Sequence, residues 1–267
     1  MPYFGEDIFA GTAAYYAKYR PAYPPALFKD IASFYGLNGH GFLLDLGCGT
    51  GELAIPLAGY FERVLAIDPD PGMLVTGRAK AAKLKITNID WQKGSSRTLT
   101  GVKDQFRLIT MGQAYHWTDE VKTLQQLFEM TEPGGGLVIV GSGPVAQNRL
   151  AKRKDEAVTE LLAKYLGPRR RAGRYIYKPS SLSWEKQLFP YSAYGGFKKR
   201  VYVIKVVRDL GQIVGVLYSM SWARREYFGP HLDDFEAELR QKLSSILAGQ
   251  KLAEQVRFEA FFLTKNG

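Results

Sequence analysis

The stretch that decides the fold is LLDLGCGTGE at residues 43–52. An apolar run leads into glycines spaced as G-x-G-x-G, and a helical pattern follows, which is the order strand, turn, helix. Glycines let the backbone turn sharply and approach a ligand that a Cβ atom would keep away, so the loop predicts a nucleotide-like cofactor. Glu52 stands where a dinucleotide motif has its third glycine, and a carboxylate there disfavours a pyrophosphate. The loop therefore favours a cofactor without phosphates.

The next predicted strand, residues 63–67, runs into Asp68, Pro69 and Asp70. A carboxylate at the end of the second strand of such a unit conventionally accepts hydrogen bonds from both ribose hydroxyls. Asp68 is therefore the predicted ribose ligand.

Outward from these two motifs, short apolar runs alternate with helical patterns. We expect strands at 41–46, 63–67, 86–91, 106–110 and 136–140, and helices at 52–60, 72–82 and 119–130. This alternation predicts a doubly wound parallel sheet. Two later apolar runs, 198–207 and 256–263, would close its edge, so the expected fold is a Rossmann-like α/β sheet of seven mostly parallel strands.

The rhythm changes after Val140, and the chain divides into three expected regions. Residues 1–144 form a cofactor-binding core with an N-terminal lid, 145–197 an inserted cap, and 198–267 the strands and helices that complete the sheet. The cap, together with residues 217–228, is expected to shape an acceptor pocket over the carboxyl ends of the strands. The cap offers arginines for an anion and aromatic side chains that either line the pocket or only pack; these are Arg169, Arg174, Tyr175, Tyr177, Trp184, Tyr191 and Tyr194.

The motifs DLGCGTG at 45–51 and AIDPDPGML at 66–74 resemble those of class I S-adenosylmethionine-dependent methyltransferases. The resemblance covers about half the chain, from Tyr16 to about Val140. It implies S-adenosylmethionine as methyl donor, S-adenosylhomocysteine as product and a transferase activity of the EC 2.1.1 class. It implies a donor site in which the glycines wrap the amino-acid part, Asp70 and Met73 flank the adenine, and small residues read its edge. From these segments we expect donor contacts at Asp45, Gly47, Cys48, Gly49, Gly51, Asp68, Pro69, Asp70, Met73, Ser95 and Ser96.

Two further segments, residues 16–24 and 112–117, resemble the branch that includes trans-aconitate methyltransferase, which acts on small molecules. Aromatic rings attract a sulfonium cation, and an arginine can hold a carboxylate, so Tyr16, Tyr19, Arg20 and Tyr23 are assigned to a lid over the donor. The alternative is an amphipathic helix packed by its tyrosines. Gln113 and His116 follow the fourth strand near the transferred methyl, and both are candidate catalytic residues, with Gln113 also a donor contact.

Composition bounds the setting of this reaction. The 267 residues carry 36 Lys and Arg against 26 Asp and Glu, a net charge of +10 that is spread along the chain. One cysteine, an acidic N-terminal segment and no long apolar run predict a cytoplasmic protein without membrane contact. No His, Asp and Glu cluster has the spacing of a metal site, so no metal is expected. Oligomeric state stays open between monomer and homodimer.

The predicted function is methyl transfer by in-line displacement to a small-molecule carboxylate, hydroxyl or amine, with an anionic or aromatic acceptor favoured. The main alternative is an RNA-directed methyltransferase, suggested by the net charge. Nucleic acid is nevertheless disfavoured. Residues 110–113 read TMGQ and lack the N/D-P-P-Y/F signature that enzymes methylating base nitrogens commonly carry after the fourth strand. Methylation at C5 of a pyrimidine needs a cysteine nucleophile, but the single cysteine, Cys48, lies in the glycine loop. A non-enzymatic cofactor binder and a dehydrogenase are weaker alternatives.

Overall fold

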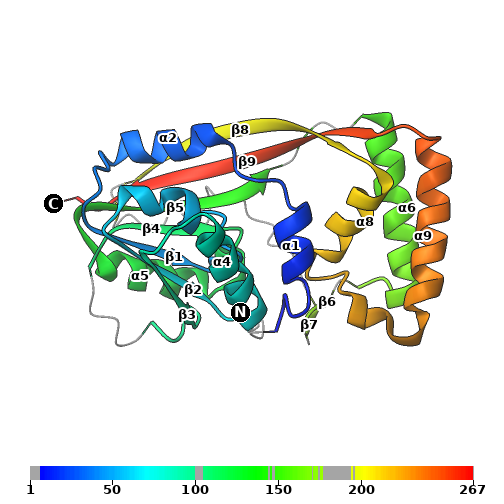
Figure 1. The fold of residues 1–267 in the computed structure, drawn as a ribbon, viewed down its shortest axis with the longest axis horizontal. Coiled ribbons are helices and arrows are strands. Elements are labelled where there is room, and N and C mark those ends of the chain that lie inside the picture. Colours follow the sequence, from blue (N-terminus) through cyan, green and yellow to red (C-terminus); the bar gives the residue numbers. More distant parts are fainter. Residues whose placement is uncertain are drawn as a thin grey trace.

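The computed structural model describes residues 7–99, 105–143, 145, 148–169, 171–173, 175–176, 194 and 196–266. Its centre is a seven-stranded sheet in the order β3-β2-β1-β4-β5-β9-β8 (Figure 1). The strands are β1 (Phe42–Leu46), β2 (Arg63–Asp68), β3 (Ile89–Lys93), β4 (Phe106–Gly112), β5 (Thr131–Gly143), β8 (Phe197–Arg208) and β9 (Leu252–Thr264). The first five run parallel, and β9 is antiparallel to both of its neighbours. The expected Rossmann-like, mostly parallel sheet is confirmed.

Helices cover both faces of the sheet and give it two cores. One face packs against α2 (Pro25–Phe34), α3 (Ala54–Leu57) and α4 (Pro71–Lys83), and the other packs against α5 (Glu120–Met130). Successive strand residues point to opposite faces, so the neighbours Leu43 and Leu44 belong to different cores. The order of the strands reverses between β1 and β4, and open α/β sheets bind ligands at such a switch point.

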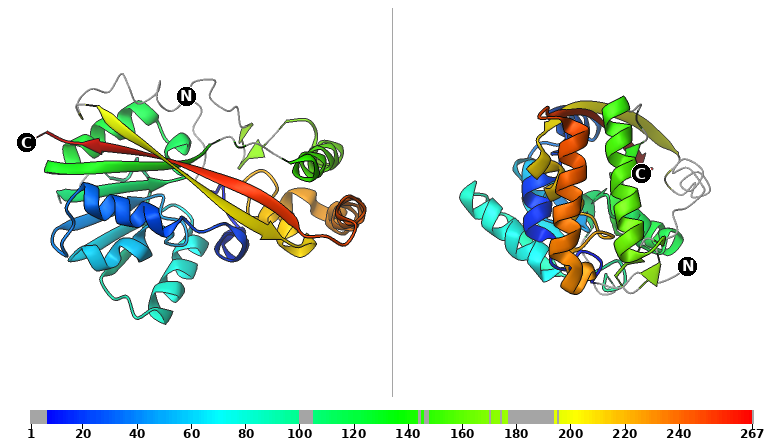
Figure 2. Two further views of the ribbon diagram at one scale, coloured as in Figure 1. Left: turned by 90° about the horizontal axis from the view of Figure 1, so that it is seen from above. Right: turned by 90° about the vertical axis from the view of Figure 1, so that its right-hand side faces the viewer.

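A helical lobe with a core of its own lies beside the sheet (Figure 1). It contains α6 (Arg149–Leu166), α8 (Leu210–Tyr218), η4 (Arg225–His231) and α9 (Leu232–Leu247), and α6 and α9 run side by side in Figure 2. Leu161, Phe235 and Leu239 are fully buried there. Because α8 and α9 are inserted between β8 and β9, helices of the expected third region pack with a helix of the expected cap.

Helix α1 (Ala13–Tyr19) lies between the sheet and the helical lobe (Figure 1). Tyr15 stacks on Tyr19 with ring centroids 6.2 Å apart and meets the edge of Tyr218 of α8 at 5.5 Å. Tyr19 also lies against Gly215 of α8, where a Cβ atom would be 2.4 Å from the ring. The tyrosines at 15 and 19 therefore attach α1 to the lobe.

Two expected elements are shorter than their apolar patterns. The helix expected at 52–60 consists of the four-residue α3 followed by η1 (Ala58–Tyr60), because the buried carboxylate of Asp45 accepts the N–H of Ala54 and fixes the helix start there. Strand β3 begins at Ile89 rather than at 86, since the chain leaves α4 through Lys85 at φ 57° and packs Ile86 against the core before pairing starts.

Three short elements remain among the described residues. The remaining elements are η2 (Tyr115–Trp117) and the short pair β6 (Arg171–Ala172) and β7 (Tyr175–Ile176). Arg174, Tyr177, Trp184 and Tyr191 of the expected cap lie outside the described residues, as does the side chain of Tyr175. Tyr194 is buried against α5, with its ring 5.0 Å from Phe128, so it belongs to the sheet core.

Candidate active site

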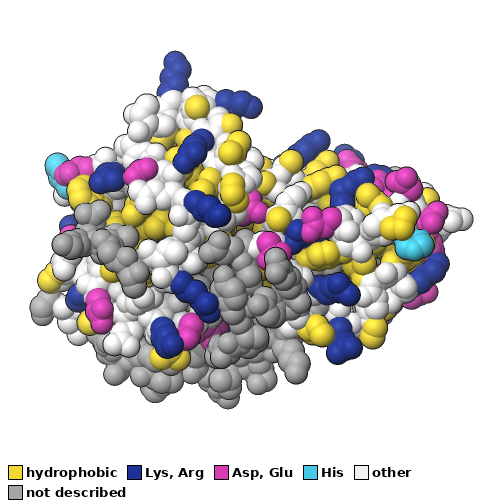
Figure 3. Space-filling view, turned by 90° about the horizontal axis from the view of Figure 1, so that it is seen from below, with side chains coloured by type: hydrophobic (Ala, Val, Ile, Leu, Met, Phe, Trp, Pro, Cys, Tyr) yellow, Lys and Arg dark blue, Asp and Glu magenta, His cyan; other side chains and the backbone are white. Residues whose placement is uncertain are grey.

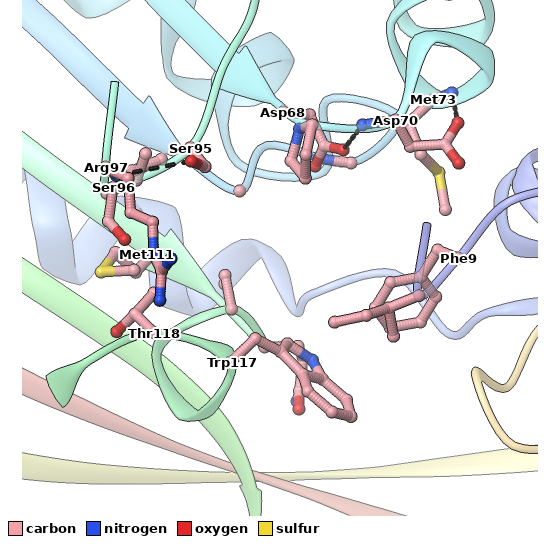
Figure 4. Close-up of a pocket in the computed structure, with 18 of the residues that line it drawn as sticks. Phe9, Asp68, Asp70, Met73, Ser95, Ser96, Arg97, Met111, Trp117 and Thr118 are labelled. Atoms are coloured by element: carbon pink, nitrogen blue, oxygen red, sulfur yellow. Dashed lines mark hydrogen bonds between the residues drawn. The ribbon is translucent and has the colours of Figure 1, made fainter. Parts of the chain in front are cut away.

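A first cavity lies at the carboxyl ends of β1, β2 and β4, where the glycine loop turns (Figure 4). Its volume is about 140 Å³. Ten of the predicted donor contacts line it: Tyr16, Gly47, Gly49, Asp68, Pro69, Asp70, Met73, Ser95, Ser96 and Gln113. Thus the glycine motif, the strand-ending acid and the segment after β3, which are distant in sequence, meet at one cavity.

The glycine loop is held against the end of β2 by its backbone. The N–H groups of Gly47 and Cys48 both donate to the carbonyl of Ile67, at 2.8 and 3.0 Å. Gly47 has φ 71°, in the left-handed region that favours glycine, and a Cβ atom there would lie 2.4 Å from the Cβ of Ala114. The loop can therefore pass this close to η2 only with glycine at position 47.

Asp68 ties the glycine loop to the start of α4. One carboxylate oxygen accepts the N–H of Gly49 at 2.9 Å and the other accepts the N–H of Asp70 at 2.9 Å. Burial raises the pKa of Asp68 to about 6, although these two N–H groups lower it. The carboxylate points into the first cavity in Figure 4, and each of its oxygens has a further lone pair for a ligand hydroxyl.

Four predicted donor contacts line neither of the two cavities described here. Asp45 is buried beneath the loop, where it accepts from Thr110 Oγ1 at 2.8 Å and from Ala54 N at 3.0 Å, and burial raises its pKa to about 7. Cys48 faces the core, and burial raises the pKa of its thiol. Gly51 has φ 85° and makes room for Trp91 and Ile55. Tyr19 packs on α8, so all four build the site from outside it.

Aromatic side chains form the wall opposite Asp68 and Met73 (Figure 4). The ring of Phe9 meets Trp117 edge-on at 5.9 Å and Tyr16 at 6.2 Å. Burial raises the pKa of Tyr16 to about 12, so its hydroxyl stays protonated at neutral pH. Ring faces attract a cation, and the carboxylates on the other wall favour one too.

The other end of the first cavity is made by the segment that follows β3. The N–H of Ser95 donates to Thr98 Oγ1 at 2.8 Å, which closes a turn and leaves Ser95, Ser96 and Arg97 along the cavity wall (Figure 4). At the opposite wall Asp70 caps α4 by accepting the N–H of Met73 at 3.0 Å, which places the Met73 side chain over the cavity.

A second cavity of about 310 Å³ lies between the sheet and the helical lobe. It shares Tyr16 and Gln113 with the first cavity, so these two side chains stand at the boundary. Two more predicted donor contacts, Arg20 and Tyr23, line it. The other lining residues come from the glycine loop, β5, the lobe and the β8–β9 strands: Pro21, Glu52, Ser142, Lys154, Asp155, Val158, Arg208, Ile213, Val216, Leu217, Met220, Trp222, Glu254, Val256 and Phe258.

The two candidate catalytic residues are placed differently. Gln113 has φ 57°, and its Nε2 donates to Ser142 Oγ at 2.7 Å, so a conformation unusual for glutamine holds its amide between the cavities. His116, in η2, lines neither of the two cavities. Burial, with a smaller effect of the positive charge of Arg20, lowers the pKa of His116 to about 4, and the imidazole is therefore neutral at pH 7.

Several lining residues were missed by sequence reasoning. Phe9 and Trp117 supply most of the aromatic wall, and Glu52 lines the second cavity while its carboxylate accepts the N–H of Thr50 at 3.1 Å. Trp117 is the last residue of the segment 112–117 that contains His116, so its place near the site could have been inferred from that segment. Phe9, which precedes the first helix, gives no comparable sequence signal.

Within the ranges given above, no group of three or more His, Cys, Asp or Glu side chains is placed to hold a metal ion. Among the helices that the structure describes, none is long and apolar enough to cross a membrane.

Known proteins that are similar to this chain are methyltransferases. Residues 43–135 match the family model of a methyltransferase domain. A methyltransferase-like protein of Schizosaccharomyces pombe is 23% identical over 85% of this chain and 84% of its own length. The trans-aconitate 2-methyltransferase of Deinococcus radiodurans is 32% identical, but over only 42% of each chain.

A solved structure shares the fold over nearly the whole chain. A methyltransferase from Thiobacillus denitrificans, in complex with S-adenosylhomocysteine, is similar with a TM-score of 0.52 at 13% identity, over 97% of each chain. The domain match spans the glycine loop, Asp68 and the segment after β3, which are the parts that build the first cavity. Residues 43–135 therefore form a methyltransferase domain of the class I S-adenosylmethionine-dependent kind.

Proposed function

We propose that this methyltransferase transfers its methyl group to a small molecule held in the second cavity. The observation that carries the proposal is the shared boundary, because Tyr16 and Gln113 line both cavities and bring two binding spaces into contact. Ligand pockets in proteins measure roughly 300–1,000 Å³. The second cavity, at about 310 Å³, has room for a small acceptor.

The residues of the first cavity fit the donor. Asp68 would accept the ribose hydroxyls, Ser95 and Ser96 would contact the adenine edge, and Gly47 and Gly49 would let the methionine part approach the backbone. Arg20, whose guanidinium lies 5.0 Å above the Tyr16 ring, would hold the methionine carboxylate. Gly49 supports this fit, because it lines the first cavity and the atom nearest to its missing Cβ position is Glu52 Oε2 at 3.3 Å, whereas the space beside Gly47 is taken by Ala114.

The donor, when bound, supplies a methyl group on a positively charged sulfur. Methyl transfer to an acceptor demands alignment above all. The aromatic wall and the nearby carboxylates stabilise positive charge, and the Gln113 amide, fixed by Ser142, positions the acceptor. His116 was a candidate proton acceptor for hydroxyl or amine substrates, but it lines neither cavity and its low pKa makes it a weak base, so Gln113 has the larger role.

Charge at the surface also favours a small acceptor. On the face seen in Figure 3, the described Lys and Arg side chains are interspersed with Asp and Glu, and no single basic surface forms there. Nucleic-acid binding depends on gathered positive charge that neutralises phosphates.

The proposal is tested by a methyl-transfer screen with labelled S-adenosylmethionine against carboxylic acids, phenols, amines and bulk tRNA, with products identified by mass spectrometry. We expect label in a small molecule. Val216→Trp, which fills the second cavity, should abolish methyl transfer without changing donor affinity. Val207→Trp, on the exposed face of β8, should leave methyl transfer intact. Label in tRNA alone would contradict the proposal.

A further inference from the structure

The second cavity has two distinct ends along strand β9. Glu254, Val256 and Phe258 are spaced by two residues and therefore line the cavity from one face of the strand. Phe258 pairs with Ser142, whose hydroxyl holds Gln113 next to the first cavity. Glu254 lies four residues further along, roughly 13 Å at the usual rise of a strand. The cavity therefore has one end at the donor and one end remote from it.

A cluster of ion pairs forms the remote end. Glu254 accepts from Lys154 Nζ of α6 at 2.7 Å and from Arg208 Nη1 of β8 at 2.7 Å. The side chains of Lys154, Arg208 and Glu254 are only 15%, 12% and 13% exposed. Asp155, the other partner of Lys154, is 45% exposed, so water screens its charge. The buried part of the cluster carries two positive charges and one negative charge.

Arg208 has hydrogen-bonding capacity left over in this cluster. Lys154 donates to Glu254 and forms an ion pair with Asp155, and each carboxylate oxygen of Glu254 already accepts a bond. Arg208 donates one bond, from Nη1, to a described residue, although a guanidinium has five N–H groups. Arg208 also lines the second cavity, and a guanidinium with donors to spare is suited to a carboxylate or another oxyanion.

Apolar side chains fill the wall between the two ends. Val158 of α6, Val216 and Leu217 of α8, and Val256 of β9 line this part of the cavity together with Met220 and Trp222. These residues offer hydrocarbon surface to whatever occupies the middle of the cavity. The polar groups are thus concentrated at the two ends.

We propose that the acceptor is an elongated amphipathic acid whose anionic group, remote from the methylated atom, is bound by Arg208. Lys154 holds Glu254, and Glu254 holds the guanidinium in place. The apolar wall contacts the body of the acceptor, and the nucleophilic atom of the acceptor lies beside Gln113. This inference rests on the proposed function, because it takes the second cavity as the acceptor site. It makes Arg208 a specificity-determining residue.

The test uses two unreactive probes of equal length, octanoate and octanamide, titrated by calorimetry into the protein with S-adenosylhomocysteine present. We expect octanoate to bind at least about tenfold more tightly than octanamide. Arg208→Gln should reduce this ratio to less than about threefold, while Lys205→Gln should preserve it. Lys205 is a matched control because it carries the same charge on the same strand and is exposed.

A second variant keeps the proposal testable if Arg208→Gln fails to fold. Glu254→Gln retains Arg208 and removes the negative charge beside it, so the preference for octanoate should increase. Equal affinities for the two probes, no binding of either, or a preference that survives Arg208→Gln would overturn the inference. Failure of S-adenosylhomocysteine itself to bind would instead overturn the donor site, and with it the proposed function.

Discussion

Asp68 is the residue on which the donor site depends most. Its two oxygens already hold the loop and the start of α4, and the proposed ribose bonds would use the same charge. Asp68→Asn should weaken S-adenosylhomocysteine binding roughly 10- to 100-fold, because hydrogen bonds to a charged group contribute about 1.5–3 kcal/mol. Calorimetry measures this. Asp90→Asn, on the neighbouring strand β3 and 41% exposed, is the control and should bind normally.

The pKa of Asp68 also predicts a pH dependence of donor binding. With a pKa of about 6, the carboxylate becomes protonated as the pH falls through that value and loses its capacity to accept from both a backbone N–H and a hydroxyl. The affinity of the wild-type protein for S-adenosylhomocysteine should therefore fall below about pH 6. Asp68→Asn should be flat in the same range, and a parallel fall in both proteins would assign the effect to another group.

His116 should make the free energy of unfolding depend on pH in the acidic range, although its imidazole is neutral at pH 7. Its pKa is about 4 in the folded chain against an ordinary value of 6.5, so the unfolded chain binds more protons between these values. The free energy of unfolding therefore falls as the pH drops through this window. Urea unfolding at about pH 7 and about pH 4.5 should show a smaller loss for His116→Asn than for wild type. Equal losses would contradict this, and His231→Asn at an exposed histidine is the matched control.

Helix α1 connects elements that belong to different cores, and its contact with α8 is tight. Gly215→Ala would place a Cβ atom 2.4 Å from the Tyr19 ring and push α1 away, although Gly215 lines neither of the two cavities. Since Tyr16 and Arg20 move with α1, we expect S-adenosylhomocysteine affinity to fall on the order of tenfold. Calorimetry on Gly211→Ala, in the first turn of α8 with its nearest neighbour at 3.4 Å, should show unchanged affinity.

Much of the fold was predictable, because short local sequence patterns determine the individual strands and helices. The strands β1, β2 and β4 are mostly apolar runs, and the G-x-G-x-G spacing and the acid after β2 located the wall of the first cavity that contains Gly47, Gly49 and Asp68. The second cavity was not predictable in the same way. Tyr16, Lys154, Arg208 and Glu254 are separated by tens of residues, and the pairing of β8 with β9 brings the last two together. No local pattern encodes that meeting.

The whole molecule has two packed bodies, and they should respond differently to damage. Phe235 is fully buried in the lobe and stacks on Phe228 with ring centroids 4.0 Å apart. Phe235→Ala should cost about 3–5 kcal/mol of stability through the cavity it leaves. Hydrogen exchange should then speed up in α6, α8 and α9 while β1, β4 and β5 keep their protection.

Uniform acceleration across both bodies would show instead that sheet and lobe open as one cooperative unit. Val75→Ala on α4 is the control, since that side chain is 63% exposed and its loss leaves no cavity. The Val75→Ala variant should show the same hydrogen exchange as the wild type.

The pairing of β8 with β9 carries part of the second cavity away from the parallel strands. From Phe197 to Arg208 the two strands pair without interruption, but β5 accompanies β9 only as far as Arg257. Beyond that point, among the described residues, β8 and β9 continue as a two-stranded arm that extends toward the helices, as the yellow and red strands of Figure 2 show. Two-stranded ribbons carry a larger twist than wide sheets. Glu254 and Arg208 lie on this arm, whereas Asp68 lies on β2 in the parallel part of the sheet, so substitutions that change the twist of the arm should reshape the second cavity and leave the first cavity in place.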